Sequence, residues 1–73
     1  MRMFEDLQGR LWDVAVAQES YGSLVLVFAE RSGAEIRKSQ LDASTQIEAE
    51  AELGTMSEDA LRAQLADAPR WEP

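Results

Sequence analysis

The sequence predicts an α+β fold in which a four-stranded antiparallel meander has one face covered by one or two C-terminal helices. Three observations support this prediction. Glycines recur in similar turn contexts at positions 9, 22 and 33; apolar and polar residues alternate between these turns; and helix-forming residues replace the alternation after residue 43.

A single domain is expected to take up the whole chain, because 73 residues are near the lower limit for a stable core without disulfides or metal. The sheet is expected in residues 2–40, the helical part in 44–68 and a tail in 69–73. The four strands are predicted at about 2–5, 10–18, 23–30 and 35–40.

Each of the stretches "DLQGR", "ESYGS" and "ERSGA" predicts a three-residue hairpin loop, a type I turn followed by a left-handed glycine. This assumption fixes the register: Phe4 lies opposite Trp12, Val14 opposite Phe28, and Phe28 opposite Ile36. Because side chains alternate along a strand, one face collects the large apolar residues Phe4, Trp12, Val14, Val16, Leu24, Leu26, Phe28 and Ile36. The opposite face is smaller and mixed, with Met3, Leu11, Asp13, Ala15, Ala17, Val25, Val27, Arg37 and Ser39.

The stretch "STQIEAEAELG" at 44–54 predicts a short helix. Thr45 and Glu48 have the spacing of a capping box, and Gly54 is expected to stop the helix. Ile47 and Ala51, one turn apart, form its expected apolar side.

A last helix is predicted in the stretch "TMSEDALRAQLADAP" at 55–69, ended by the proline at 69. Its N-cap is either Thr55, paired with Glu58 in a capping box, or Ser57. The apolar stripe of Leu61, Leu65 and Ala68 is narrow and single, which is typical of a helix that packs on one face of a sheet. We therefore expect this helix to close the core, with Leu61, Leu65 and Trp12 buried together.

The composition favours a non-enzymatic protein without cofactor or metal. The chain has no cysteine and no histidine, its only lysine is Lys38, and no glycine-rich phosphate loop or nucleophile elbow is present. Glu48 and Glu52 lie one helical turn apart, but two carboxylates without further ligands are more typical of a solvated helix face than of a cation site. Phe4 and Trp12 are interpreted as core rather than as a platform for nucleic-acid bases.

The net charge of −7 is concentrated late in the chain: residues 1–41 hold five basic and six acidic side chains, whereas residues 42–73 hold two basic and eight acidic ones. Such an acidic body disfavours direct contact with nucleic acid or anionic membranes and favours a protein partner with a basic surface. No signal peptide or apolar span is visible, so a cytoplasmic location is expected.

Five residues are candidates for partner binding: Glu48, Glu52, Glu58, Asp59 and Trp71. Trp71 follows a helix-ending proline in a polar tail, where it either folds back onto the core or serves as an exposed aromatic anchor. Arg37 and Lys38, adjacent on an expected edge strand, are interpreted as charges that block sheet-to-sheet aggregation.

Two motifs resemble those of small uncharacterised bacterial proteins that begin with a Phe-x-Asp-x-x-Gly-Arg-x-Trp hairpin and end with a Leu-x-x-Met-Ser-Glu-x-x-Leu-Arg helix. The matching positions are Phe4, Asp6, Gly9, Arg10, Trp12, Leu53, Met56, Ser57, Glu58, Leu61 and Arg62. The resemblance implies the fold and no activity. The stretch "KSQLDAST" departs from the pattern of those proteins.

In size and acidity the chain is also similar to small phage-encoded proteins that bind bacterial RNA polymerase. Two functional hypotheses follow. The first is a non-enzymatic regulator that binds a larger basic protein, such as RNA polymerase or other nucleic-acid-handling machinery, and the second is a structural module that self-associates through its sheet. A monomer or weak homodimer is expected.

Overall fold

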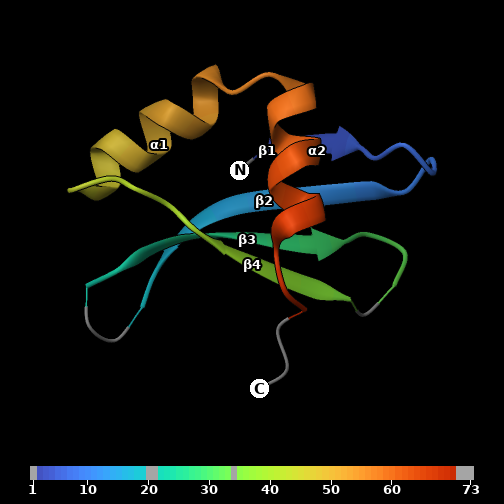
Figure 1. The fold of residues 1–73 in the computed structure, drawn as a ribbon, viewed down its shortest axis with the longest axis horizontal. Helices are drawn as coiled ribbons and strands as arrows, with labels where there is room; N and C mark the ends of the chain where they lie inside the picture. The colour runs from blue at the N-terminus through green and yellow to red at the C-terminus, as the bar shows by residue number, and fades with distance from the viewer. Residues whose placement is uncertain (1, 20–21, 34, 71–73) are drawn as a thin grey trace.

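The computed structural model describes residues 2–19, 22–33 and 35–70 of the chain. Within them, four strands are followed by two helices, and the strands lie in the order β1-β2-β3-β4 (Figure 1). All neighbouring strands are antiparallel, which confirms the predicted meander and the α+β fold. The elements are β1 Arg2–Glu5, β2 Leu11–Gln18, β3 Leu24–Glu30, β4 Ile36–Gln40, α1 Gln46–Thr55 and α2 Glu58–Asp67.

The first hairpin has the predicted turn, and the second has the predicted left-handed glycine and a closing bond from Glu19 N to Ser23 O, with residues 20–21 outside the described part of the chain. Gly9 and Gly22 have φ angles of 83° and 82°, in the left-handed region where a Cβ atom would be strained. In the first loop, Asp6 N donates to Arg10 O at 2.9 Å, which closes three residues between the paired ends. The register of β1 on β2 and of β2 on β3 is therefore the predicted one.

The third hairpin differs from the prediction. Glu30 N donates to Glu35 O at 3.1 Å, so the loop spans residues 31–34, and Gly33 is not among the glycines with positive φ. The predicted three-residue loop with a left-handed glycine is therefore wrong here. A physical reason lies in Arg10, which contacts Glu30 at 3.2 Å and Glu35 at 3.5 Å and so favours the two glutamates opposite each other.

This longer loop shifts the register of β4 by one residue. Ile36 pairs with Ala29 instead of Phe28, so its side chain lies on the face away from the helices. The predicted placement of Ile36 with the large apolar residues, and of Arg37 and Ser39 on the opposite face, is wrong. Ser39 instead faces α2, where its Oγ donates to Gln64 Oε1 at 2.7 Å.

The core lies between one face of the sheet and the two helices. Trp12, Leu61 and Leu65 belong to one buried cluster, as predicted from the apolar stripe of the last helix. The other members come from the same sheet face and from both helices: Phe4, Val14, Leu26, Phe28, Leu53 and Ala68. The rings of Phe4 and Phe28 meet edge to face, with centroids 6.0 Å apart.

Side-chain caps start both helices. Thr45 Oγ1 accepts a hydrogen bond from Glu48 N at 3.1 Å, as the capping box predicted. Of the two alternatives for α2, Ser57 is the N-cap, and its Oγ accepts from Ala60 N at 3.1 Å. Gly54 does not stop α1, because the helix continues to Thr55.

The buried side of α1 differs from the expected one. Ala49 and Leu53 are buried and α1 packs mainly against β2, whereas Ile47 is 82% exposed and Ala51 is also exposed. Arg2 in β1 contributes to this orientation, because its Nη1 donates to Leu53 O at 2.8 Å and holds the end of the helix on the sheet.

The segment after α2 runs along the edge of β4. Lys38 N donates to Pro69 O at 3.3 Å, and Arg37 forms a β-bridge with Arg70. The edge that carries Arg37 and Lys38 is thus partly occupied by the chain itself. Trp71 lies outside the described residues. Within them, neither helix is long and apolar enough to cross a membrane.

Candidate protein-binding surface

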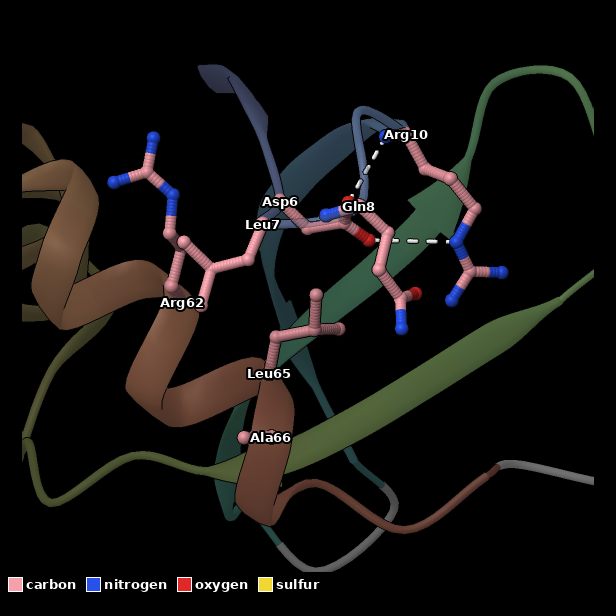
Figure 2. A pocket seen from close by; sticks show the side chains of 7 residues that line it. All are labelled: Asp6, Leu7, Gln8, Arg10, Arg62, Leu65 and Ala66. Carbon is pink, nitrogen blue, oxygen red and sulfur yellow. Dashed lines mark hydrogen bonds and ion pairs between the residues drawn. The ribbon is translucent and has the colours of Figure 1, made fainter.

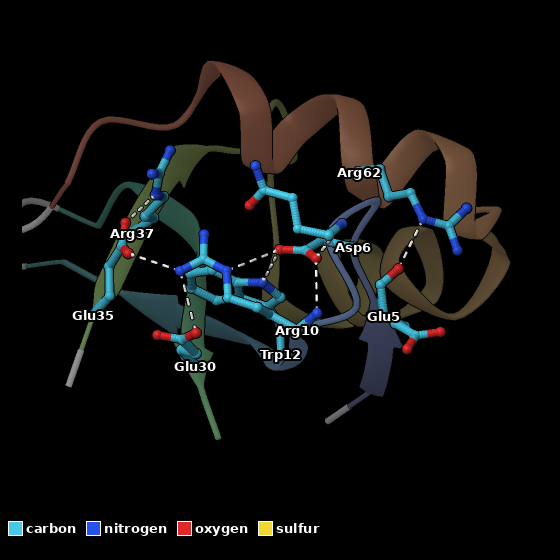
Figure 3. Close-up of polar contacts among 9 residues, drawn as sticks. Glu5, Asp6, Arg10, Trp12, Glu30, Glu35, Arg37 and Arg62 are labelled. Carbon is cyan, nitrogen blue, oxygen red and sulfur yellow. Dashed lines mark hydrogen bonds and ion pairs between the residues drawn. The ribbon is translucent and has the colours of Figure 1, made fainter. Parts of the chain in front are cut away.

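Asp6 organises the turn between β1 and β2 (Figure 3). Its Oδ1 accepts hydrogen bonds from Gln8 N and Arg10 N, both at 2.9 Å, and its Oδ2 accepts from Trp12 Nε1 at 2.9 Å. Burial disfavours the charged carboxylate, but the bonds from Trp12, Arg10 and Gln8 outweigh burial and hold the pKa of Asp6 below its usual range. The carboxylate therefore fixes the turn and accepts the hydrogen bond of the indole of Trp12, a fully buried side chain.

Arg10 joins this turn to the third hairpin. Its guanidinium lies over the Trp12 ring, 5.3 Å from the centroid, and contacts the carboxylates of Asp6 at 3.4 Å, Glu30 at 3.2 Å and Glu35 at 3.5 Å. Burial lowers the pKa of Arg10, but the three carboxylates outweigh this effect and raise it above its usual value. One cation is thus shared by three acids, an arrangement that stabilises the fold.

Glu35 has a second basic partner. Arg37 Nε donates to its Oε2 at 2.6 Å, and this bond, opposed by burial and assisted by the charges of Arg37, Arg10 and Arg70, holds the pKa of Glu35 below its usual range. Asp6 and Glu35 therefore keep their negative charge at lower pH than ordinary carboxylates do.

A pocket of about 220 Å³ opens between this turn and α2 (Figure 2). It is lined by Asp6, Leu7, Gln8, Arg10, Arg62, Leu65 and Ala66. Three charged groups at its wall have partners: Asp6 and Arg10 form an ion pair, and Arg62 Nε donates to Glu5 O at 2.8 Å. In the described part of the chain, no group of three or more carboxylate, histidine or cysteine side chains is placed to hold a metal ion.

Most basic side chains are engaged in ion pairs within the fold. Arg31 contacts Asp13 at 3.1 Å, Lys38 contacts Glu19 at 2.5 Å, and Arg62 contacts Asp59 at 2.9 Å and Glu58 at 3.2 Å. Acidic side chains exceed basic ones, so some remain without a cation. Among the described residues, the acids with no basic side chain in ion-pair distance are Glu5, Asp42, Glu48, Glu50, Glu52 and Asp67.

The predicted partner-binding residues fall into two groups. Glu48 and Glu52 lie exposed on α1, where Glu48 Oε2 also accepts from Ser44 N at 3.0 Å. Glu58 and Asp59 lie in the first turn of α2, where Arg62 offsets their charge. Trp71, the fifth candidate, is outside the described residues.

Two residues of α1 belong to this surface although the sequence did not single them out for binding. Glu50 is exposed and has no basic partner, and Ile47 is 82% exposed on a helix whose other large apolar residue, Leu53, is buried. We call the exposed side chains of Ile47, Glu48, Glu50 and Glu52 the α1 surface. The alternation "IEAEAE" was a usable signal, because its glutamates cannot all face a core.

Comparison of this chain with protein-family models, with curated proteins and with solved structures finds no match. The motif resemblance inferred from the sequence therefore stays a prediction.

Proposed function

We propose that this protein is a small non-enzymatic regulator that binds a basic region of a larger protein through the α1 surface. The observation that carries this proposal is the exposure of Ile47 among the carboxylates of Glu48, Glu50 and Glu52, none of which has a basic partner in the described structure. An apolar side chain within a charged rim is the usual composition of a specific, electrostatically steered interface.

The distribution of charge supports the direction of this contact. No lysine or arginine occurs between Lys38 and Arg62, whereas six acidic residues lie in that interval. The nearest cation to α1 is Arg2, which binds the carbonyl oxygens at the C-terminal end of the helix rather than its glutamates. The negative potential of α1 is thus directed to solvent, where it attracts a basic surface.

Proteins that handle nucleic acids have basic surfaces for their own substrates, and an acidic protein can compete for such surfaces. Bacterial RNA polymerase is the first partner to test, with regulation of transcription in the cytoplasm as the corresponding role. Trp71 and the α2 acids Glu58 and Asp59 are secondary candidates for the same contact.

The test compares two double variants that remove the same charge from different helices. Glu48→Gln with Glu52→Gln changes the α1 surface, and the glutamine at 48 retains an oxygen for the Ser44 N–H. Glu58→Gln with Asp59→Asn changes acids that Arg62 already offsets. In titrations with purified RNA polymerase and with basic proteins captured from lysate, we expect the α1 variant to bind about 2- to 30-fold more weakly, as two exposed charge pairs contribute roughly 0.2–1 kcal/mol each.

Ile47→Asp provides a second measurement of the same surface. Because Ile47 is largely exposed, the substitution leaves the core intact, and we expect it to abolish binding at the centre of the contact. Equal affinity of wild type and the α1 variants, together with a loss in the α2 variant, would place the contact on α2 and refute the proposal for α1.

A further inference from the structure

We propose that the sheet face opposite the helices is a self-association surface on which a second copy of this chain packs. We call this face the open face, because neither helix covers it: the strand residues that belong to the buried cluster with the helices all point to the other side. In Figure 1, α2 lies in front of the sheet, so the open face is the rear of the molecule. This inference is independent of the α1 surface, which lies on the helical side.

The register of β4 makes the open face more apolar than the sequence suggested. Ile36 pairs with Ala29, Ala29 with Asp13, and Asp13 with Met3. Met3, Ala29 and Ile36 therefore lie in one row across the sheet, with Asp13 between Met3 and Ala29. Val27 and Ala15 are directly paired in the next row, and Leu11 precedes Asp13 by two residues on the same face. The apolar patch therefore consists of Met3, Leu11, Ala15, Val27, Ala29 and Ile36.

The side chains of this patch leave room for a second sheet. Met3 and Leu11 are 49% and 41% exposed, and Ile36 and Val27 are half-buried. The short side chains of the alanines at 15 and 29 protrude little from the middle of the face. A second sheet can therefore approach to roughly 10 Å, the usual distance between two packed sheets.

Most charges on the open face are paired, unlike those of α1; among its described acids only Glu5, opposite Leu11 at the end of β1, has no basic side chain in ion-pair distance. Asp13 is paired with Arg31 at 3.1 Å, and Lys38 with Glu19 at 2.5 Å. The second pair joins β4 to the residue after β2, on the opposite side of β3. Two copies can therefore meet over the middle of this face without bringing unpaired acids together, with Glu5 at its β1 edge.

Strand addition at a sheet edge is less suited to self-association. The β4 edge is occupied at Lys38 by Pro69 O, and on the outer edge of β1 the carbonyl of Glu5 accepts from Arg62 Nε. Face-to-face packing needs neither edge, and it keeps the acidic α1 helices of the two copies on the outer sides of the dimer.

Charge favours a second copy over a basic foreign partner, because Asp13 and Glu19 on this face are already paired with Arg31 and Lys38 and offer little net negative charge. The two longer extents of the molecule, loops and helices included, are 32 and 29 Å, so the open face can at most approach the roughly 800 Å² per partner that stable interfaces bury. The apolar patch takes only part of this area, so we expect a dissociation constant in the micromolar range, on the order of 10–500 μM.

Sedimentation equilibrium of the full chain over a concentration series tests the inference. We expect the mass of wild type to rise from its monomer value of 8.1 kDa towards twice that value. Leu11→Glu should stay monomeric, because it places an acid in the apolar patch, whereas the matched control Ile47→Glu on α1 should dimerise like wild type. Met3→Glu is a second variant of the patch, and circular dichroism verifies that each variant is folded.

Salt provides an additional readout. The dissociation constant of the wild-type dimer should fall about 2- to 10-fold from low to high salt, because salt screens the repulsion between two chains of net charge −7. The inference would be overturned if wild type stayed monomeric up to about 1 mM. It would also be overturned if Ile47→Glu abolished the dimer while folded Leu11→Glu and Met3→Glu retained it. Because Leu11→Glu leaves the α1 surface unchanged, failure of this test and failure of the proposed function are distinguishable.

Discussion

Truncation of the two leucines of α2 should destabilise the protein to different extents. Leu61 is fully buried in the core cluster, whereas Leu65 is 7% exposed and lines the open pocket beside the first turn. Leucine to alanine removes three carbons, about 2.4 kcal/mol at roughly 0.8 kcal/mol per buried CH₂ group. A closed cavity adds a further penalty, so that Leu→Ala in a sealed core costs about 3–5 kcal/mol.

Leu61→Ala should therefore cost about 3–5 kcal/mol, because the space it leaves is enclosed by the sheet and α1. Leu65→Ala widens an opening that already exists, so its cost should stay close to the transfer term, about 2–3 kcal/mol. For a chain of 73 residues the total stability is expected to be only about 4–11 kcal/mol. Leu61→Ala thus leaves the protein close to unfolding at room temperature.

Urea unfolding followed by far-ultraviolet circular dichroism measures both free energies. The control is Ile47→Ala, a truncation of similar size at an exposed site on α1, which should change stability by less than about 0.5 kcal/mol. If Leu65→Ala costs more than Leu61→Ala, the pocket is not open to solvent as described. If neither variant differs from the control, α2 does not pack on the sheet.

Three further predictions concern two glycines, the acid cluster around Arg10 and the salt dependence of binding. Gly54→Ala should stabilise the protein by about 0.5–1 kcal/mol in urea unfolding, because Gly54 lies inside α1 with no atom near its Cβ position, whereas Gly22→Ala should destabilise it, since φ is 82° there. Asp6 and Glu35 have lowered pKa values in the folded state, so their contribution to stability is complete above the usual carboxyl pKa of about 4 and is lost as pH falls through the folded values. Asp6→Asn should therefore lower the free energy of unfolding at pH 7 and make it depend less on pH in the acid range. A pH dependence of stability equal to that of wild type would contradict this role of Asp6. Binding of a basic partner to the α1 surface should weaken as salt rises, while self-association strengthens; salt responses of the same sign would contradict one of the two surfaces.

Much of the fold could be predicted because local signals agreed with one another. Gly9 and Gly22 specify left-handed positions, and the residues between them alternate with period two, so turn chemistry and burial give the same register. The caps of both helices were also visible, since Thr45 and Ser57 directly precede helix-forming residues.

The errors arose where a long-range interaction decided between local alternatives. Gly33 resembles the first two turn glycines in sequence, but the register of β4 brings Glu30 and Glu35 together at Arg10, a residue 20 or more positions away. In α1, Ile47 and Leu53 are both apolar, and only the contact of the helix with β2 and Arg2 determines which of them is buried. Neither choice is encoded in a window of neighbouring residues.

The candidate surface was predictable in its charge but not in its location. Sequence alone treats Glu48, Glu52, Glu58 and Asp59 as equivalent acids in an acidic region. The fold separates them, because Arg62 lies one helical turn from Glu58 and Asp59 and contacts both, whereas α1 contains no basic residue. Ion pairing within the fold thus determines which negative charges remain for a partner.

The two proposed surfaces lie on opposite sides of the sheet, and this placement has a consequence for binding. A dimer formed through the open face carries one α1 helix on each outer side, so it presents two copies of the α1 surface that point away from each other. Such a dimer can bind two basic partners or two separate sites, but it cannot place both α1 helices on one small epitope. Self-association would then increase affinity only for partners that are themselves clustered or repeated, because the second contact becomes local once the first has formed.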